Sequence, residues 1–298
     1  MKRVFFIAFI IFYISFTCAL AEIEEIIKRA DRLYEVERHD DSVDYLLQSM
    51  DRVKLKRDRA ELYWRLARAT LNIGDRREKE GASTDELLEI FEKGQQYAEQ
   101  AIEHDPKNHF GHYWKSANIG RWGQTKGILD SLFKAGPMRD LLKRAVELNP
   151  DHSQSYNVLG QLYEQVPGFP LSFGNVDFSV SLGRKACDLL AIQHRMGLEK
   201  ELDYDFYTEL AKHLYARNWV SSKREREQER KYARYKSISH PFEKNLYYEG
   251  SIELEDISDR EEALKLIKWV IAELEKISPR KVSQNDDLKE AKETLAGW

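Results

Sequence analysis

The chain has 298 residues, a length that allows one or two compact domains or one elongated repeat array. Aromatic residues make up 11% of it, and glycine and proline occur only 15 and 7 times, which excludes a disordered chain and favours a helix-rich fold. The formal net charge of −4 arises from 47 basic and 51 acidic residues mixed along the sequence, so nothing indicates a nucleic-acid-binding protein.

The first 21 residues have the pattern of a secretory signal peptide. Two basic residues precede an apolar run, and Ala19-Leu20-Ala21 forms an A-x-A cleavage site before a charged segment. We therefore predict a mature chain that begins at Glu22 and resides in the periplasm or another extracytoplasmic compartment. Two alternatives stay open, which are lipidation of Cys18 and an uncleaved membrane anchor, because the apolar run approaches the length that spans a bilayer.

Helix pairs are expected to follow one another along the rest of the chain. Apolar and small residues recur at helical spacing, and prolines or short polar breaks separate the segments. In chain order the pairs are expected at residues 30–49, 60–103, 109–149, 156–190, 204–236 and 247–270. In the third pair, Pro137 is expected to begin a helix after an amphipathic insert. The charged segment 285–298 is expected to form a final capping helix.

The clearest repeat motif lies between Lys143 and Tyr163. Its residues stand at the aromatic-x2-Leu-Gly-x2-Tyr spacing of a tetratricopeptide repeat (TPR), carried by Tyr156, Leu159, Gly160 and Tyr163. Gly160 allows two helices to approach closely, and the chain resembles the TPR family at these positions. The resemblance implies an all-α, right-handed solenoid of about six antiparallel helix pairs over residues 22–298, with a C-terminal capping helix.

Two irregular segments narrow the resemblance. Pro106 and Pro150 are 44 residues apart, about ten more than one TPR, and residues 166–174 form an apolar loop where repeats usually have a short polar turn. With these features the chain is similar to the TPR component associated with bacterial TRAP transporters, and more distantly to the regulator-of-microtubule-dynamics proteins. The first similarity implies an alternative role, that of a ligand-handling accessory of a solute transporter.

The TPR resemblance also implies a binding groove. In that family, the first helix of each pair lines a concave face, where aromatic and arginine side chains capture a protein or peptide partner. In register, these positions are Trp64, Arg68, Leu71, Phe110, Tyr113, Arg121, Asn157, Gln161, Glu164, Thr208, Lys212 and Tyr215. The favoured function is therefore a non-enzymatic binding or scaffold protein with a protein or peptide partner. The alternative for Phe110 and Tyr113 is simple packing against the neighbouring pair.

The insert at 126–136 and the loop at 166–174 are expected to pack together at one rim of this groove. Apolar side chains in a loop need a covering surface, and the insert offers an apolar helix face. Phe169 and Phe173 are the residues expected to contact the partner from the rim. Two alternatives are that each segment packs only on its own helix pair, or that both form an oligomer contact.

Other chemistry-bearing residues do not form a catalytic pattern. His104, His109 and His112 are interpreted as surface histidines near a loop, with a zinc site as the alternative. The segment 223–236 alternates basic residues with glutamates, which favours a solvated helix face over a site for an anionic partner. Cys187, the only cysteine after residue 21, is expected to be a buried, unreactive thiol. We therefore expect no enzyme activity, no cofactor and no metal.

Overall fold

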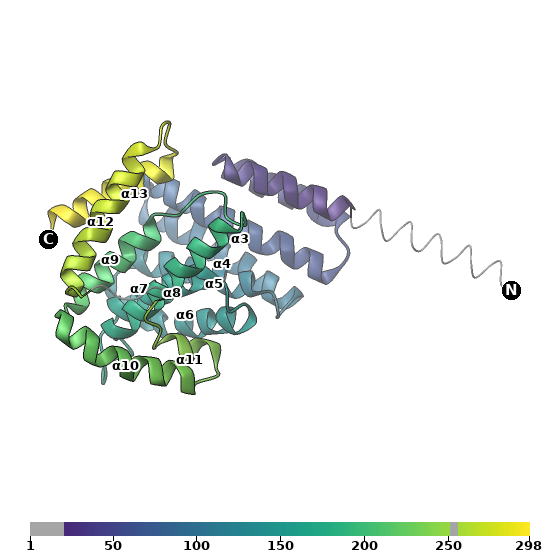
Figure 1. Ribbon diagram of the computed structural model, residues 1–298. Coiled ribbons are helices and arrows are strands. Elements are labelled where there is room, and N and C mark those ends of the chain that lie inside the picture. Colours follow the sequence, from purple (N-terminus) through teal and green to yellow (C-terminus); the bar gives the residue numbers. More distant parts are fainter. Residues whose placement is uncertain (1–20, 251–255) are drawn as a thin grey trace. The chain divides into compact units, whose positions relative to one another are not determined.

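The computed structural model describes residues 21–250 and 256–298, apart from the side chains of residues 128–131, and it is built from helices (Figure 1). This part of the chain contains no β-strand, and its one isolated bridge, between Gly168 and Gly174, closes a loop. The predicted all-α class is therefore confirmed. The predicted signal peptide, apart from Ala21, lies outside the described residues, and so do its two alternatives, a lipidated Cys18 and an uncleaved membrane anchor. The chain divides between Leu141 and Leu142 into two compact units, called unit 1 and unit 2.

Unit 1 consists of antiparallel helix pairs. Each helix packs mainly on its neighbour in sequence, and α3 also packs directly on α5, as successive first helices do in a repeat array. Its elements are a helix over residues 21–35, α2 (His39–Ser49), the 3-10 turn η1 (Met50–Arg52), α3 (Lys56–Lys79), α4 (Thr84–His104), α5 (His109–Lys126) and the first part of α6 (Ile128–Leu148).

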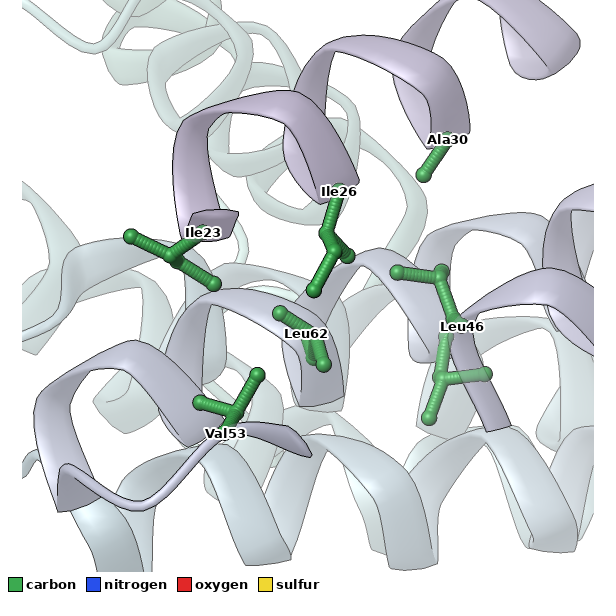
Figure 2. Close-up of a cluster of buried hydrophobic side chains, with 7 residues drawn as sticks. Ile23, Ile26, Ala30, Leu46, Val53 and Leu62 are labelled. Carbon is green, nitrogen blue, oxygen red and sulfur yellow. The ribbon is translucent and has the colours of Figure 1, made fainter. Parts of the chain in front are cut away.

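The first helix pair has the weakest repeat pattern, yet it has a defined core. Figure 2 shows side chains of the helix at 21–35 pointing toward Leu46 of α2 and Leu62 of α3. Ile26, Ala30 and Leu46 are fully buried, and the Ser42 hydroxyl donates a hydrogen bond to the Ala30 carbonyl at 3.1 Å. The prediction of a first pair at residues 30–49 is confirmed, although its first helix begins earlier.

The insert predicted between α5 and α6 is part of α6 itself. The helix runs without a break from Ile128 to Leu148 and contains Pro137 in its interior, so the prediction that Pro137 begins a new helix is wrong. The helix starts after Gly127, which has a φ of +127° and ends α5. The added residues therefore lengthen one helix instead of forming a separate one.

Unit 2 departs from the predicted pairing. Its elements are the rest of α6, α7 (Ser153–Gln165), α8 (Val176–Arg195), α9 (Asp205–Arg217), α10 (Ser221–Ser237), α11 (Pro241–Asn245), α12 (Asp259–Lys276) and α13 (Val282–Ala296). α7 pairs with α8 as predicted, but α9 packs on α8 and α12 instead of on α10. The predicted pairing of residues 204–217 with 223–236 is wrong, and so is the separate sixth pair, of which residues 251–255 lie outside the described ranges.

The sequence of α12 explains why it replaces α10 as the partner of α9. Ala263, Ile267 and Val270 form a fully buried apolar stripe on α12, whereas α10 buries only the charged side chains of Arg224 and Lys231. Ser258 and Glu261 form a reciprocal capping box that starts α12, which accounts for the position of its N-terminus. α13 packs on α12 and, more lightly, on α9, and occupies the place predicted for the capping helix.

Gly160 lies at a close approach of three helices. A Cβ atom on Gly160 of α7 would lie 2.9 Å from Nε2 of His213 on α9 and 3.3 Å from the Ser179 carbonyl oxygen on α8. A Cβ on Gly183 of α8 would lie 3.0 Å from Cδ2 of the same histidine. The predicted close approach at Gly160 is confirmed, and the space that the two glycines leave is filled by the fully buried ring of His213.

The apolar loop at 166–174 folds on itself and leaves its tip uncovered. The Gly174 N–H donates to the Pro167 carbonyl at 2.9 Å, and the Phe173 ring meets Tyr163 edge-on with centroids 5.2 Å apart. Phe169 is 93% exposed and Leu171 is 84% exposed, and Phe133 of the predicted insert is 81% exposed. Within unit 2 the loop therefore covers Phe173 but not Phe169 or Leu171, and its packing on the insert stays a prediction.

No helix among the residues that the structure describes combines the length and the hydropathy that a bilayer crossing requires.

Candidate protein-binding surface

Four side chains from three first helices of unit 1 form a continuous row. The guanidinium of Arg68 on α3 lies 3.7 Å from the ring centroid of Tyr34, and Trp64 stacks on Phe110 of α5 with centroids 4.3 Å apart. Arg68 also lies 5.1 Å from the Trp64 ring, which links the two contacts. We call Tyr34, Arg68, Trp64 and Phe110 the aromatic–arginine row. Three of its members were predicted as groove residues, and the structure brings them together. Trp64 is only 4% exposed and packs beneath the row, whereas the Arg68 side chain keeps 16% of its surface exposed.

Carboxylates fix the arginines of this row in place. Asp31 on the helix at 21–35 accepts hydrogen bonds from Arg65 at 3.0 Å and from Arg68 at 2.5 Å. Partial burial acts to raise the pKa of Asp31, but the hydrogen bonds and charges of both arginines outweigh it and hold that pKa below its ordinary value. Glu61 accepts further bonds from the Trp64 indole N–H at 2.9 Å and from Arg65 at 2.7 Å. These bonds hold the row in one conformation, and the two carboxylates balance the positive charges of Arg65 and Arg68.

Arg121, another predicted groove residue, joins α5 to α3. Its guanidinium donates to Asp75 at 2.7 Å and to Glu78 at 2.5 Å, and its side chain stays 25% exposed. Burial raises the pKa of Asp75 despite the neighbouring arginine. Tyr113 is 9% exposed and packs edge-on against Trp114 with centroids 4.8 Å apart. Phe110, which stacks on Trp64 of the preceding pair, and the buried Tyr113 therefore both fit the alternative of packing, whereas the Arg121–Glu78 pair still faces solvent.

The predicted groove positions of α7 in unit 2 are held by polar contacts. Glu164 accepts a short hydrogen bond from Nδ1 of His213 on α9. Asn157 is 4% exposed, and its Nδ2 lies 3.4 Å from the carboxylate of Asp205 at the start of α9. Gln161 between them is half-buried. These side chains connect α7 to α9.

The groove positions of α9 are engaged by α9 itself and by the C-terminal helix. Thr208 donates to the Tyr204 carbonyl at 3.3 Å. The Lys212 ammonium donates to Glu290 of α13 at 2.5 Å, and Tyr215 stacks on Trp298 with centroids 4.3 Å apart and an angle of 3° between the rings. Lys212 and Tyr215 were predicted to face a partner, and in this structure they face the end of the chain itself.

Sequence reasoning did not single out Asp31, Tyr34 or His213. The first two belong to the first pair, whose repeat pattern is weak, but Asp31 and Tyr34 lie three residues apart and thus on one helix face, which was a usable signal. For His213 the signal was indirect: glycines at the small positions of both α7 and α8 leave room for a large neighbour. Nothing local in the α9 sequence identifies that neighbour.

The three histidines near the start of α5 take separate roles. His104 contacts the Gln100 carbonyl through Nδ1 at 2.9 Å, His112 contacts the Pro106 carbonyl through Nε2 at 3.0 Å, and His109 packs on Phe110 with centroids 4.0 Å apart. Burial lowers the pKa of His109 to about 4. Cys187 is buried as predicted, and burial raises the pKa of its thiol.

The prediction of a solvated face on α10 is wrong for two of its basic side chains. Lys231 is 1% exposed and donates to Asp177 and to Ser181 of α8, each at 2.7 Å. Arg224 is paired with Glu262 and lies 3.4 Å from the Asp259 carboxylate. They belong to what we call the buried ion cluster, in which four cations meet four carboxylates: Arg184, Arg217, Arg224, Lys231, Asp177, Glu249, Asp259 and Glu262. This cluster holds α10 to α8 and α12.

Comparison with known proteins supports the TPR-like fold. A solved, thermophilic TPR protein of Thermus thermophilus superposes with a TM-score of 0.52 over 90% of this chain and 98% of its own, at 13% sequence identity. At that identity the likeness concerns the fold alone. The profile of the family "Regulator of microtubule dynamics protein 1-3" matches residues 26–168, which is just under half of the chain.

Two curated relatives extend the comparison to the sequence. Regulator of microtubule dynamics protein 1 of Bos taurus is 28% identical over 190 residues, which are 63% of this chain and 56% of that protein. The protein of the same name from Mus musculus is 27% identical over 193 residues, or 64% of this chain and 60% of the relative. The chain thus matches less than two thirds of the length of these relatives.

These relatives correct two expectations. The predicted periplasmic or otherwise extracytoplasmic location is wrong, because the relatives come from cattle and mouse, whose cells have no periplasm, and are named for an action on microtubules. The closer similarity to a TRAP transporter component finds no support among them, whereas the similarity to regulators of microtubule dynamics does. The comparisons and the structure agree that the chain has a TPR-like helical fold.

Proposed function

We propose that this chain is a non-enzymatic, TPR-type binding protein that recognises a polypeptide through the first-helix face of unit 1. The aromatic–arginine row is the observation that supports this proposal. It extends over three helices, it is held rigid by Asp31 and Glu61, and it lies within the region that matches the microtubule-regulator family. A prearranged face of this kind loses little conformational entropy when a partner binds.

The exposed edge of this face has mixed charge. Glu78 is 49% exposed and Arg121 is 25% exposed, and their ion pair lies on the same pair of first helices as the row. Because the relatives are named as regulators of microtubule dynamics, the partner we propose is tubulin, either free or assembled. The chain matches just over half of the length of those relatives, so an action on microtubules is proposed for it and is not taken over from them.

The deciding experiment combines microtubule co-sedimentation with tubulin polymerisation followed by turbidity. The test variant is Glu78→Lys, which reverses a charge on the first-helix face. The matched control is Glu99→Lys on the second helix α4, because Glu99 is similarly exposed, at 55%, and is also paired with a basic side chain of α5, Lys115 at 3.0 Å. The first variant should weaken binding and the second should not. Equal binding by both variants, or no binding by the unmodified chain, would contradict the proposal.

The exposed loop tip is a second contact that we propose for the same partner. Phe169 and Leu171 are 93% and 84% exposed, so replacing both with serine should reduce binding without lowering the unfolding temperature. Phe173 differs because its ring packs on Tyr163, so Phe173→Ser should lower stability. If the double variant binds as tightly as the unmodified chain, the loop tip has no part in recognition.

A further inference from the structure

Lysine and tyrosine side chains lie against one another where α10 ends and α11 begins. The Lys236 ammonium lies 4.7 Å from the ring centroid of Tyr232, one helical turn earlier on α10. Tyr235, on the same helix, has the Lys244 ammonium of α11 at 4.3 Å from its ring centroid. Tyr232, Tyr235 and Lys236 share one face of α10, because they are spaced by three and four residues.

The same row of contacts continues onto α8. The Tyr235 ring meets the ring of Tyr248 with centroids 5.6 Å apart, and the Lys185 ammonium of α8 lies 5.3 Å from the Tyr248 ring. The Tyr248 hydroxyl donates to Asp188 at 2.7 Å, which fixes this ring in place. We call the whole set the lysine–tyrosine patch, and its members are Lys185, Tyr232, Tyr235, Lys236, Lys244 and Tyr248.

The lysines of this patch have aromatic rings beside them instead of carboxylates. Within the part of the chain that the structure describes, no carboxylate forms an ion pair with Lys185, Lys236 or Lys244. By contrast, Arg230, earlier on α10, is paired with Glu227. A cation over an aromatic ring keeps its full charge, so the patch stays available to an anion.

Positive charge accumulates most at the end of the patch formed by α10 and α11. Burial lowers the pKa of Lys185. Asp151 and Asp188 oppose that effect, and the nearby charge of Lys244 adds to it. Carboxylates therefore accompany the α8 end. Along α10 and into α11, residues 230–242 include no acidic residue.

We propose that the lysine–tyrosine patch binds an acidic segment of a partner polypeptide. Each lysine offers a point charge to one carboxylate, and the 57% exposed Tyr232 adds contact area and a hydroxyl donor. The cation–π contacts hold the ammonium groups in place, so binding costs less side-chain entropy. The patch belongs to unit 2 and the aromatic–arginine row to unit 1, so the patch would be a second binding site.

Other anionic partners fit this patch less well. Phosphate groups of nucleic acids are best matched by the forked guanidinium of arginine, whereas the members of the patch that carry charge are lysines. Anionic membranes attract clusters of about four to eight basic residues, together with apolar side chains that enter the lipid. Here the rings lie against the lysines of the patch itself, which leaves no apolar side chain of the patch to enter a bilayer.

The test is fluorescence anisotropy of a fluorescein-labelled oligoglutamate peptide titrated with the full chain. The peptide should bind, and the affinity should fall as NaCl is raised from about 50 to about 300 mM. Lys236→Glu with Lys244→Glu should weaken binding at least about tenfold. Lys236→Glu alone, at an exposed position, should weaken it by a smaller factor. The control is Lys276→Glu with Lys289→Glu, which makes the same change in net charge at exposed lysines that are each paired with a glutamate of their own helix.

The control variant should bind the peptide as the unmodified chain does. The proposal is overturned if the unmodified chain does not bind oligoglutamate, or if the patch variant and the control lose affinity equally, because net charge alone would then explain binding. Phosphatidylserine vesicles and a single-stranded oligothymidylate serve as competitors. Stronger, patch-dependent binding of either one would assign the surface to a lipid or to a nucleic acid and would also overturn the proposal. None of these measurements involves tubulin, so their outcome is separate from that of the proposed function.

Discussion

Gly160 illustrates how one missing side chain controls the packing of unit 2. A leucine there would clash with the His213 ring and with the backbone of α8, so Gly160→Leu should lower the free energy of unfolding by about 1–3 kcal/mol. Urea unfolding followed by circular dichroism measures this difference. The control is Gly136→Ala, because a Cβ at Gly136 would meet no atom within 4 Å and alanine favours the helix by up to about 1 kcal/mol. Equal effects of the two changes would mean that His213 adapts freely.

His109 makes the stability of unit 1 dependent on pH. Burial, only partly offset by Glu61, lowers its pKa from 6.5 to about 4, so the unfolded chain takes up a proton at a higher pH than the folded chain does. The stabilising contribution is complete above about pH 6.5 and is lost as the pH falls toward 4. The urea midpoint of the unmodified chain should therefore fall between pH 7 and pH 5, and His109→Gln should reduce that fall. The same fall in both proteins would assign the effect to other groups.

At the scale of single elements, α10 depends on charges that lie inside the fold. Lys231 is 1% exposed between Asp177 and Glu249, so Lys231→Met should remove the cationic partner of Glu249 and leave Asp177 paired with Arg217 alone, at a cost of about 3–5 kcal/mol of stability. The neighbouring Arg230 is 64% exposed and is paired with Glu227 of its own helix, so Arg230→Met should cost at most about 1 kcal/mol. Urea unfolding of the two variants separates these outcomes, and similar losses would mean that the buried ion cluster contributes no more than a surface pair.

The same helix shows which parts of this structure could be predicted from its sequence. Local patterns identified the helices, the break at Pro150 and the close approach at Gly160, because these depend on residues near one another in the chain. The alternating charges of α10 correctly indicated a helix but wrongly indicated exposure. The carboxylates that allow Lys231 to be buried lie 54 residues before it and 18 after it, since 231 − 177 is 54 and 249 − 231 is 18. No local charge pattern contains that information.

The candidate binding surface could also be predicted only where it depends on the regular repeat. The TPR register placed Trp64, Arg68 and Phe110 on one face, and the structure brings them into contact. It did not reveal that Lys212 would pair with α13 and that Tyr215 would stack on Trp298 after it, because the register describes contacts within a regular repeat. The terminal helix itself was predicted as a cap, but its contact with these groove positions was not.

For the molecule as a whole, that terminal helix is expected to be structural. α13 buries Leu288 and Ala291, and it contributes the Glu290–Lys212 pair at the exposed end of the repeat array. A chain that ends at Lys281 should therefore unfold at a lower temperature, as measured by scanning calorimetry. Trp298→Ala, which removes only the stacking on Tyr215, is the milder comparison and should cost less. An unchanged unfolding temperature after truncation would show that α12 can end the array without a cap.

The order of charges in the buried ion cluster has a consequence for how the chain is made. Arg184 and Arg217 are synthesised 78 and 42 residues before Glu262 and Asp259, the carboxylates that pair with them. Arginine keeps its charge, so Arg184 cannot leave water until Glu262 has emerged from the ribosome, and Arg217, which has Asp177 as an earlier partner, still lacks Asp259. At the usual rate of about 5–20 residues per second, the wait for Arg184 lasts roughly 4–16 s. During that interval the face of α9 that α12 will cover stays open to the solvent, where a chaperone at the ribosome can reach it.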